Sequence, residues 1–179
     1  MAIVGVGQTE HRFRRDDVTY PELAREAVAR ALEHAGLEVG DVEAAVLALA
    51  PDALMGVAHA ERWVADALGV AGKPFMRVNT GGSTGITTAH AAFYHVASGM
   101  FDCVLAAGAD RVGESGDAQL VLNTMWDVLY ERPFPLNAIN MLALQAVRYM
   151  AKYGTTEYHM ALAAVKNRRH ALKNPHAHI

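Results

Sequence analysis

The sequence lacks the features that mark several large classes of protein. Its 179 residues contain a single cysteine, Cys103, so no disulfide can form within the chain, and this usage fits a reducing compartment. Sixteen Lys and Arg face 19 Asp and Glu, which leaves no positive excess to attract nucleic acid or an anionic membrane. No apolar run approaches the roughly 20 residues of a membrane-spanning helix, and the N-terminal MAIVGVGQTEHRF has no basic leader. We therefore expect a cytoplasmic globular chain.

Short apolar runs alternate with amphipathic segments over the first 110 residues. Thr19 and Glu22 have the spacing of a capping box, which predicts a helix that ends at Gly36. Strands are predicted at residues 2–6, 44–49, 75–79 and 103–109, with helices between them at 20–35, 57–68 and 84–98. This β-α-β-α-β-α-β order is typical of an α/β protein with a mostly parallel sheet covered by helices.

The pattern changes after Asp110. Helices are predicted there at residues 119–130, 138–152 and 157–172. We accordingly divide the chain into an α/β core, residues 1–112, and a helical loop region, residues 113–179. The sequence stops just after a helix, and a four-stranded sheet would keep an open apolar edge. We therefore expect the chain to be the first part of a larger fold.

The stretch MRVNTGGSTG, residues 76–85, joins the third predicted strand to a helix through a glycine-rich turn. Backbone N–H groups around Gly82–Gly85 would point out of the helix N-terminus, where they stabilise negative charge. The segment therefore predicts an anion or oxyanion site, formed by Gly82, Ser83, Thr84 and Gly85.

Three kinds of chemistry share this strand–turn–helix geometry. Gly81-x-Ser83-x-Gly85 matches the elbow of a serine hydrolase, with possible partners at Asp102, Asp110, His159 and His170. A phosphate-binding loop of the Walker type would need lysine after its last glycine, where this chain has Ile86. The third is a reactive-cysteine turn from which the cysteine has been lost.

The third interpretation is supported by a resemblance. The stretches AIVGVGQTEHRF, VNTGGSTGITTAHAAFYHVASGMFDCVLAAGAD and LALQAVRYMAKYGTTEYHMALAAVKNRRHALKNPHA resemble the N-terminal half of thiolase-superfamily subunits of the sterol-carrier-protein or lipid-transfer type. In that family the elbow reads approximately Val-Asn-x-x-Cys-x-Ser-Gly. Val78, Asn79 and Gly85 match, whereas the cysteine position falls on Gly82 and Thr84 stands at the serine. The resemblance implies a thiolase-like fold, with this chain as the N-terminal half of a duplicated core.

Glycine at position 82 has no side chain to hold an acyl group, so condensation through an acyl-enzyme is excluded at this elbow. The chain resembles lipid-transfer-protein-type aldolases of bacterial steroid breakdown. That implies retro-aldol cleavage of a 17-hydroxy steroid acyl-CoA to a 17-keto steroid and propionyl-CoA, with coenzyme A present only as part of the substrate. A non-catalytic acyl-CoA-binding homologue is the alternative within the superfamily. The catalytic acid and base are expected outside this chain.

The resemblance also implies partners. Thiolases dimerise through the strand before the elbow, here Phe75, Met76, Arg77, Val78 and Asn79. The aldolases work with a small protein that has an OB fold and a zinc-ribbon-like segment. No metal site is expected in this chain: His90 and His95 are five residues apart and lie on different faces of their predicted helix.

Overall fold

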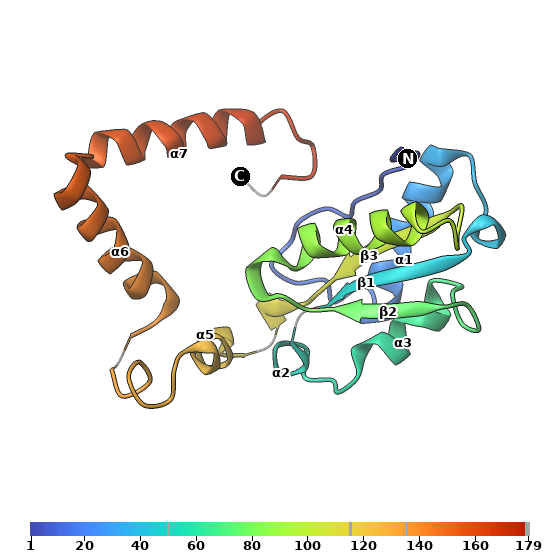
Figure 1. Cartoon of the computed structure of the whole chain (residues 1–179), viewed down its shortest axis with the longest axis horizontal. Helices are drawn as coiled ribbons and strands as arrows, with labels where there is room; N and C mark the ends of the chain where they lie inside the picture. The colour runs from blue at the N-terminus through green and yellow to red at the C-terminus, as the bar shows by residue number, and fades with distance from the viewer. Residues whose placement is uncertain (50, 115, 135, 178–179) are drawn as a thin grey trace. The chain divides into compact units, whose positions relative to one another are not determined.

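The computed structural model describes residues 1–49, 51–114, 116–134 and 136–177 (Figure 1). The chain divides into two units, Met1–Ser115 and Gly116–Ile179. Each unit is built around its own elements, and the first contains the sheet.

Three parallel strands form the sheet, in the order β2-β1-β3. They are β1 (Ala44–Leu49), β2 (Phe75–Val78) and β3 (Val104–Ala109). The register aligns Ala45 with Phe75 on one side of β1 and Ala44 with Val104 on the other. Because β1 is central and helices cover both of its faces, almost every residue along it is buried.

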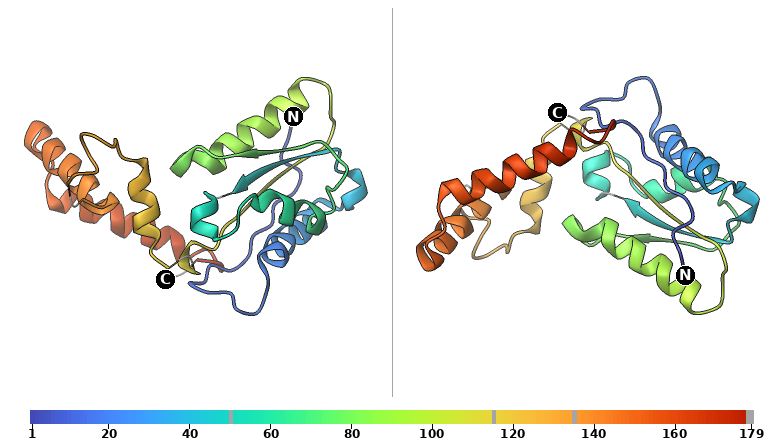
Figure 2. Two further views of the ribbon diagram at one scale, coloured as in Figure 1. Left: turned by 90° about the horizontal axis from the view of Figure 1, so that it is seen from below. Right: turned by 90° about the horizontal axis from the view of Figure 1, so that it is seen from above.

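Helices cover the two faces of the sheet unequally. Helix α4 (Thr84–Ala97) lies on one face, and α1 (Tyr20–Ala35) and α3 (Ala60–Ala67) lie on the other (Figures 1 and 2). The side of α1 and α3 holds the main core, with Leu47, Val64 and Val70 almost fully buried. On the outer side of α4, Ile86 and Tyr94 remain exposed. The apolar core therefore lies mainly between β1, α1 and α3.

The capping box predicted for α1 is confirmed. Glu22 N–H donates to Thr19 Oγ1 at 3.4 Å, and Thr19 N–H donates to Glu22 Oε2 at 2.7 Å. The helix ends at Gly36, whose φ of 68° lies in the left-handed region. Local sequence alone specifies both ends of this helix.

The strand predicted at residues 2–6 is wrong. Both edges of β1 are occupied by β2 and β3, and the N-terminal segment instead lies along α1. Val6 N–H donates to Nδ1 of His34 at 3.1 Å. A Cβ added at Gly5 would overlap the carbonyl oxygen of Ala31, so glycine permits this close approach. The apolar run has strand composition, but it packs along α1 and does not join the outer edge of β2 or β3 in the described sheet.

The predicted helix at residues 57–68 is shorter than expected. A separate short helix, α2 (Asp52–Met55), ends at Gly56, and α3 begins only at Ala60 after His59, which has a φ of 56°. The short 3-10 helices of this unit are η1 (Val39–Asp41), η2 (Gly81–Ser83) and η3 (Val112–Glu114). The remaining strands and helices of the core agree with the prediction within a residue at each end.

The second unit is helical. Its elements are α5 (Ala118–Leu122), η4 (Asn123–Met125), α6 (Ala138–Tyr153) and α7 (Glu157–Ala171). The predicted helix 119–130 is wrong beyond Met125, whereas the two later helices match the prediction closely. All side chains classed as buried in the described residues belong to the first unit. Among the helices of the described segments, none is long and apolar enough to span a membrane.

Candidate functional site

The glycine-rich turn lies at the carboxyl end of β2, as the sequence predicts. Strand β2 ends at Val78, the 3-10 helix η2 follows at Gly81–Ser83, and α4 begins at Thr84 (Figure 1). Carboxyl ends of parallel strands are where open α/β sheets bind ligands. The predicted elbow is therefore in a position suited to a site.

Asn79 and Gly81 shape the turn. Gly81 has a φ of 64°, a conformation that residues with a Cβ rarely adopt. Its N–H donates to Oδ1 of Asn79 at 3.1 Å. The asparagine thus closes the turn from within, as Asx turns do. The Asn-x-Gly pattern is the sequence signal for this contact.

Gly82 is the residue to which the resemblance assigns the cysteine position of the family. Its φ lies outside the left-handed region, and a Cβ built on it would meet no atom within 4 Å. A side chain would therefore fit at this position without strain. Among the hydrogen bonds of the turn in the described residues, none has the N–H of Gly82 as its donor. Helix α4 begins two residues later, so the positive end of its dipole lies near Gly82.

Hydroxyl groups hold the turn together. Ser83 Oγ donates to the Thr80 carbonyl at 3.0 Å and contacts Thr80 Oγ1 at 3.1 Å. Thr84 Oγ1 donates to the Gly81 carbonyl at 2.7 Å and accepts from Thr80 N–H at 2.9 Å. These bonds are local, so Ser83 and Thr84 brace the turn on which Gly82 sits.

In the described part of the chain, none of the four predicted hydrolase partners forms a hydrogen bond with Ser83. Asp102 N–H donates to Glu43 Oε2, and Asp110 accepts from a nearby backbone N–H in its own loop. His159 and His170 belong to α7 of the second unit, where the His159 ring caps the helix start at Thr156. The Ser83 hydroxyl donates to Thr80 and not to a base, so it lacks the activation that a nucleophilic serine needs.

A charged network lies beside the strand that leads to the turn. Arg77 Nη1 is 2.6 Å from Asp52 Oδ1 and 2.9 Å from Glu61 Oε2. The hydrogen bond from Arg77 holds the pKa of Asp52 below its ordinary value. Sequence reasoning missed this network, because its three members come from separate elements. It ties β2 to α2 and α3 just before the turn.

Tyr20 is a second feature that the sequence did not reveal. Its hydroxyl donates to the Ala109 carbonyl at the end of β3, at 3.0 Å. Burial raises the pKa of Tyr20 well above its ordinary value, and the charge of Asp110 acts in the same direction. The phenol is therefore neutral and fixes α1 to the carboxyl end of the sheet.

Cys103 does not replace the missing nucleophile. It is half-buried and packs against the core cluster. Burial raises the pKa of the thiol, which lowers the fraction present as nucleophilic thiolate. Glu114, a carboxylate near the end of the sheet, is structural as well, since it is paired with Arg111 at 2.6 Å.

No cluster of three or more metal-ligating side chains occurs in the segments that the structure describes. His95 hydrogen-bonds to the Ala91 carbonyl of its own helix at 2.7 Å and stacks on Phe101. That side chain therefore has a packing role. The chemistry that the elbow offers is that of backbone N–H groups, a helix N-terminus and open space above Gly82.

Comparison with known proteins identifies the family of the chain. The chain matches the thiolase N-terminal domain family over residues 1–179. It is 29% identical to an acetyl-CoA acetyltransferase of Methanothermobacter thermautotrophicus, over 99% of this chain and 46% of that protein. It is 31% identical to sterol carrier protein 2 of Bos taurus, over 98% of this chain and 34% of that protein.

A solved structure of an Ltp2-ChsH2(DUF35) aldolase superposes with a TM-score of 0.72 and 30% identity, covering 97% of this chain and 44% of that one. The chain thus spans less than half the length of these relatives. The match confirms the predicted thiolase-like α/β fold and its N-terminal half. The chain belongs to the thiolase family.

Proposed function

We propose that this chain is part of an acyl-CoA-dependent carbon–carbon lyase, which cleaves a 17-hydroxy steroid acyl-CoA to a 17-keto steroid and propionyl-CoA. The observation that carries the proposal is the open space around Gly82, the residue to which the resemblance assigns the nucleophile position of the family. An elbow without a nucleophile suits a reaction that needs a thioester-binding scaffold and no acyl-enzyme.

In the proposed reaction a base removes the proton of the 17-hydroxyl group. The carbon–carbon bond beside it breaks as the new ketone forms, and the electron pair moves onto the thioester side as an enolate. Backbone N–H groups near Gly82 would stabilise the enolate oxygen. An acid then protonates the carbon next to the thioester carbonyl and releases propionyl-CoA. We place the acid and base outside residues 1–179.

The relatives support a reaction of this class without specifying the substrate. The superposed structure is that of an aldolase at 30% identity. Several other relatives are sterol carrier proteins, which associates the family of this chain with lipids. The acetyltransferase relatives carry out a chemistry for which the elbow of this chain has no thiol.

Two protein partners belong to the proposal. Strand β2 is an edge of the described sheet, and Phe75 and Met76 on it are 41% and 43% exposed. A second copy could extend the sheet along Phe75–Val78 and Asn79, which would cover this edge. The second partner is a small protein with an OB fold and a zinc-ribbon-like segment. The presence of a ChsH2(DUF35) component in the aldolase structure supports it.

A non-catalytic acyl-CoA-binding or lipid-binding homologue is the second candidate. It is favoured by the absence of a side chain at Gly82 and by the sterol carrier protein relatives. A serine hydrolase that uses Ser83 is a third, opposed by the hydrogen bond of the Ser83 hydroxyl to Thr80.

The three candidates give different results in one assay. The intact protein, which also supplies the acid and base placed outside residues 1–179, is incubated with its small partner and the steroid thioester. The products are separated by liquid chromatography and identified by mass spectrometry. A lyase yields propionyl-CoA and the 17-keto steroid in equal amounts. A hydrolase yields free coenzyme A and a steroid acid, and a fluorophosphonate probe labels Ser83. Saturable binding of the thioester without turnover would identify the non-catalytic homologue.

A further inference from the structure

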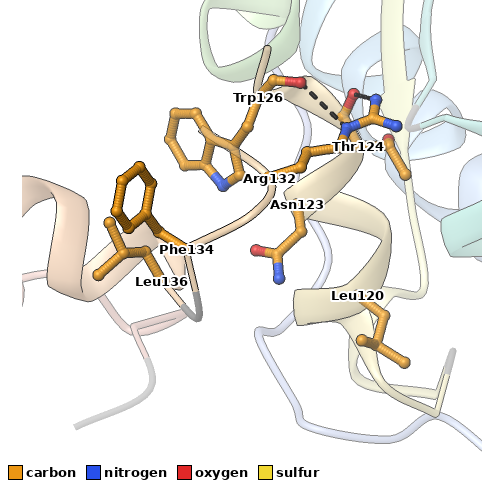
Figure 3. A pocket seen from close by; sticks show the side chains of 7 residues that line it. All are labelled: Leu120, Asn123, Thr124, Trp126, Arg132, Phe134 and Leu136. Atoms are coloured by element: carbon orange, nitrogen blue, oxygen red, sulfur yellow. Dashed lines mark hydrogen bonds between the residues drawn. The ribbon is translucent and has the colours of Figure 1, made fainter. Parts of the chain in front are cut away.

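A cavity lies within the second unit. It has a volume of about 200 Å³ and is lined by residues of α5, η4 and the loop that follows (Figure 3). The lining residues are Leu120, Asn123, Thr124, Trp126, Arg132, Phe134 and Leu136. The hydrogen bonds of the elbow described above involve none of these side chains.

The indole N–H of Trp126 is buried and meets no acceptor in the described residues. Figure 3 shows the indole nitrogen on the side of the ring that faces the space between Phe134 and Asn123. A buried N–H group without a partner lowers stability, and native proteins satisfy nearly all such groups with protein, water or ligand. We therefore expect an acceptor for the Trp126 N–H group inside the cavity.

Asn123 supplies a second donor. Its side-chain Oδ1 accepts a hydrogen bond from Gln119 Nε2 at 2.7 Å, which fixes the orientation of the amide. The oxygen is thus occupied, and the NH₂ group has no acceptor among the described residues. The polar side-chain groups of Trp126 and Asn123 that are available to a ligand are both donors.

Arg132 adds a positive charge. Its Nε and Nη2 donate to the carbonyls of Trp126 and Thr124, at 3.0 and 2.6 Å. The residue lines the cavity, and its guanidinium points toward Thr124 (Figure 3). The nearby acids are occupied elsewhere: Asp127 Oδ1 accepts from two backbone N–H groups, and Glu131 Oε2 accepts from Asp127 N–H. Within the described part of the chain, no carboxylate lies within ion-pair distance of Arg132.

The walls of the cavity are apolar. The Trp126 ring, Phe134 and Leu136 lie on one side, and Leu120 lies on another (Figure 3). An apolar cavity of about 150 Å³ accommodates benzene, so about 200 Å³ admits one ring with a short polar extension. Donors and a cation beside apolar walls fit a ligand with an apolar body and a negatively charged acceptor group.

We propose that this cavity binds a small carboxylic acid with a single aromatic or alicyclic ring. The carboxylate accepts from Trp126 Nε1 and Asn123 Nδ2 in the field of Arg132, and the ring packs against Phe134 and Leu136. Binding at this cavity is measured without turnover, so the proposal holds or fails separately from the proposed function.

The test uses the ¹H–¹⁵N spectrum of the tryptophan side chains. The sequence has two tryptophans, so Trp63→Phe identifies the signal of Trp126 and also serves as the control variant. Titration with 3-phenylpropionate should shift the Trp126 indole signal saturably and leave that of Trp63 in place. The neutral isostere 3-phenylpropanamide should bind about tenfold more weakly, because it lacks the charge.

Trp126→Phe keeps an aromatic wall and removes the N–H group. Measured by calorimetry, it should weaken 3-phenylpropionate binding about tenfold, whereas Trp63→Phe should leave the affinity unchanged. The proposal is overturned if the Trp126 signal does not move, if acid and amide bind equally, or if Trp126→Phe binds as tightly as the unmodified chain. Should Trp126→Phe fail to fold, the comparison of acid with amide on the unmodified chain still decides.

Discussion

The carboxamide oxygen of Asn79 accepts a hydrogen bond from the N–H of Gly81, 3.1 Å away, and this contact closes the turn between β2 and α4. The same two residues flank Thr80. The Ser83 hydroxyl donates to the Thr80 carbonyl and contacts the Thr80 hydroxyl. The thiolase elbow in this chain is therefore held by short-range polar contacts. A substitution that removes one of these contacts should therefore lower the free energy of unfolding.

Replacing Asn79 tests the closing contact. Asn79→Ala removes the acceptor for Gly81 N–H and should lower the free energy of unfolding by about 1 kcal/mol. Asn79→Asp keeps an acceptor of the same reach, so its stability should stay near that of the unmodified chain. Urea unfolding followed by circular dichroism measures both. Equal losses in the two variants would show that the side-chain oxygen does not close the turn.

Gly81 and Gly82 are neighbours with opposite requirements. Gly81→Ala places a Cβ on a residue with a φ of 64°, which should reduce the free energy of unfolding by about 1 kcal/mol or more. Gly82→Ala adds a Cβ where no atom lies within 4 Å, and the change should stay within about 0.5 kcal/mol. Thermal unfolding of the two variants measures the loss of stability at each position. A larger loss at position 82 would contradict the geometry of the turn.

Gly82→Cys restores the family's thiol at the elbow. The side chain fits, and it lies beside the N-terminus of α4, which lowers thiol pKa values. Iodoacetamide should therefore modify the introduced thiol much faster than Cys103, whose pKa is raised by burial. Peptide mass spectrometry measures both rates, with the unmodified chain as the control for Cys103. Faster alkylation at Cys103 would be incompatible with an open, electropositive elbow.

The Arg77 network predicts a dependence on acidity. A carboxylate with a lowered pKa in the folded state stabilises the fold above its unfolded pKa, about 3.9 for Asp, and loses this contribution as the pH falls through the lower folded value. Arg77 lowers the pKa of Asp52 in this way. The free energy of unfolding should therefore fall below about pH 4.

Asp52 is partly exposed, so the contribution of its pair with Arg77 should not exceed about 1 kcal/mol. Urea unfolding between about pH 6 and pH 3 should show a shallower decline for Arg77→Met than for the unmodified chain. Parallel curves for the two proteins would mean that the network contributes nothing to acid sensitivity.

The sequence predicted those parts of the fold that depend on local patterns. Thr19 and Glu22 specify the start of α1 through their spacing, and Gly36 specifies its end. The run Ala44–Leu49 has the pattern of a buried strand and forms one. Residues 2–6 have similar composition but lie along α1 instead, because contacts distant in sequence, such as that of Val6 N–H with His34, decide where the segment packs. On α3, Trp63 is 61% exposed, whereas its neighbour Val64 is buried, a difference that the composition of the segment does not reveal.

The site was predictable to a similar extent. The glycine turn could be recognised from the residues alone, whereas the loss of a cysteine at Gly82 is a prediction that rests on the family resemblance. The hydroxyl contacts of Thr80 and the pairing of Arg77 with Asp52 could not, because residues of several types would satisfy the same pattern. The cavity at Trp126 was also missed: a helix was predicted across it, but the chain turns after Met125, where Asp127 caps the backbone of Leu129.

The central claim is that the elbow serves enolate chemistry without a nucleophile. It is tested most directly by running the reaction in D₂O with the steroid thioester and the small partner protein. Protonation of the enolate by solvent predicts propionyl-CoA with one deuterium on the carbon next to the carbonyl, and no acyl group on the protein by intact mass. Unlabelled propionyl-CoA, or an acyl-protein adduct that forms and decays during turnover, would contradict the account.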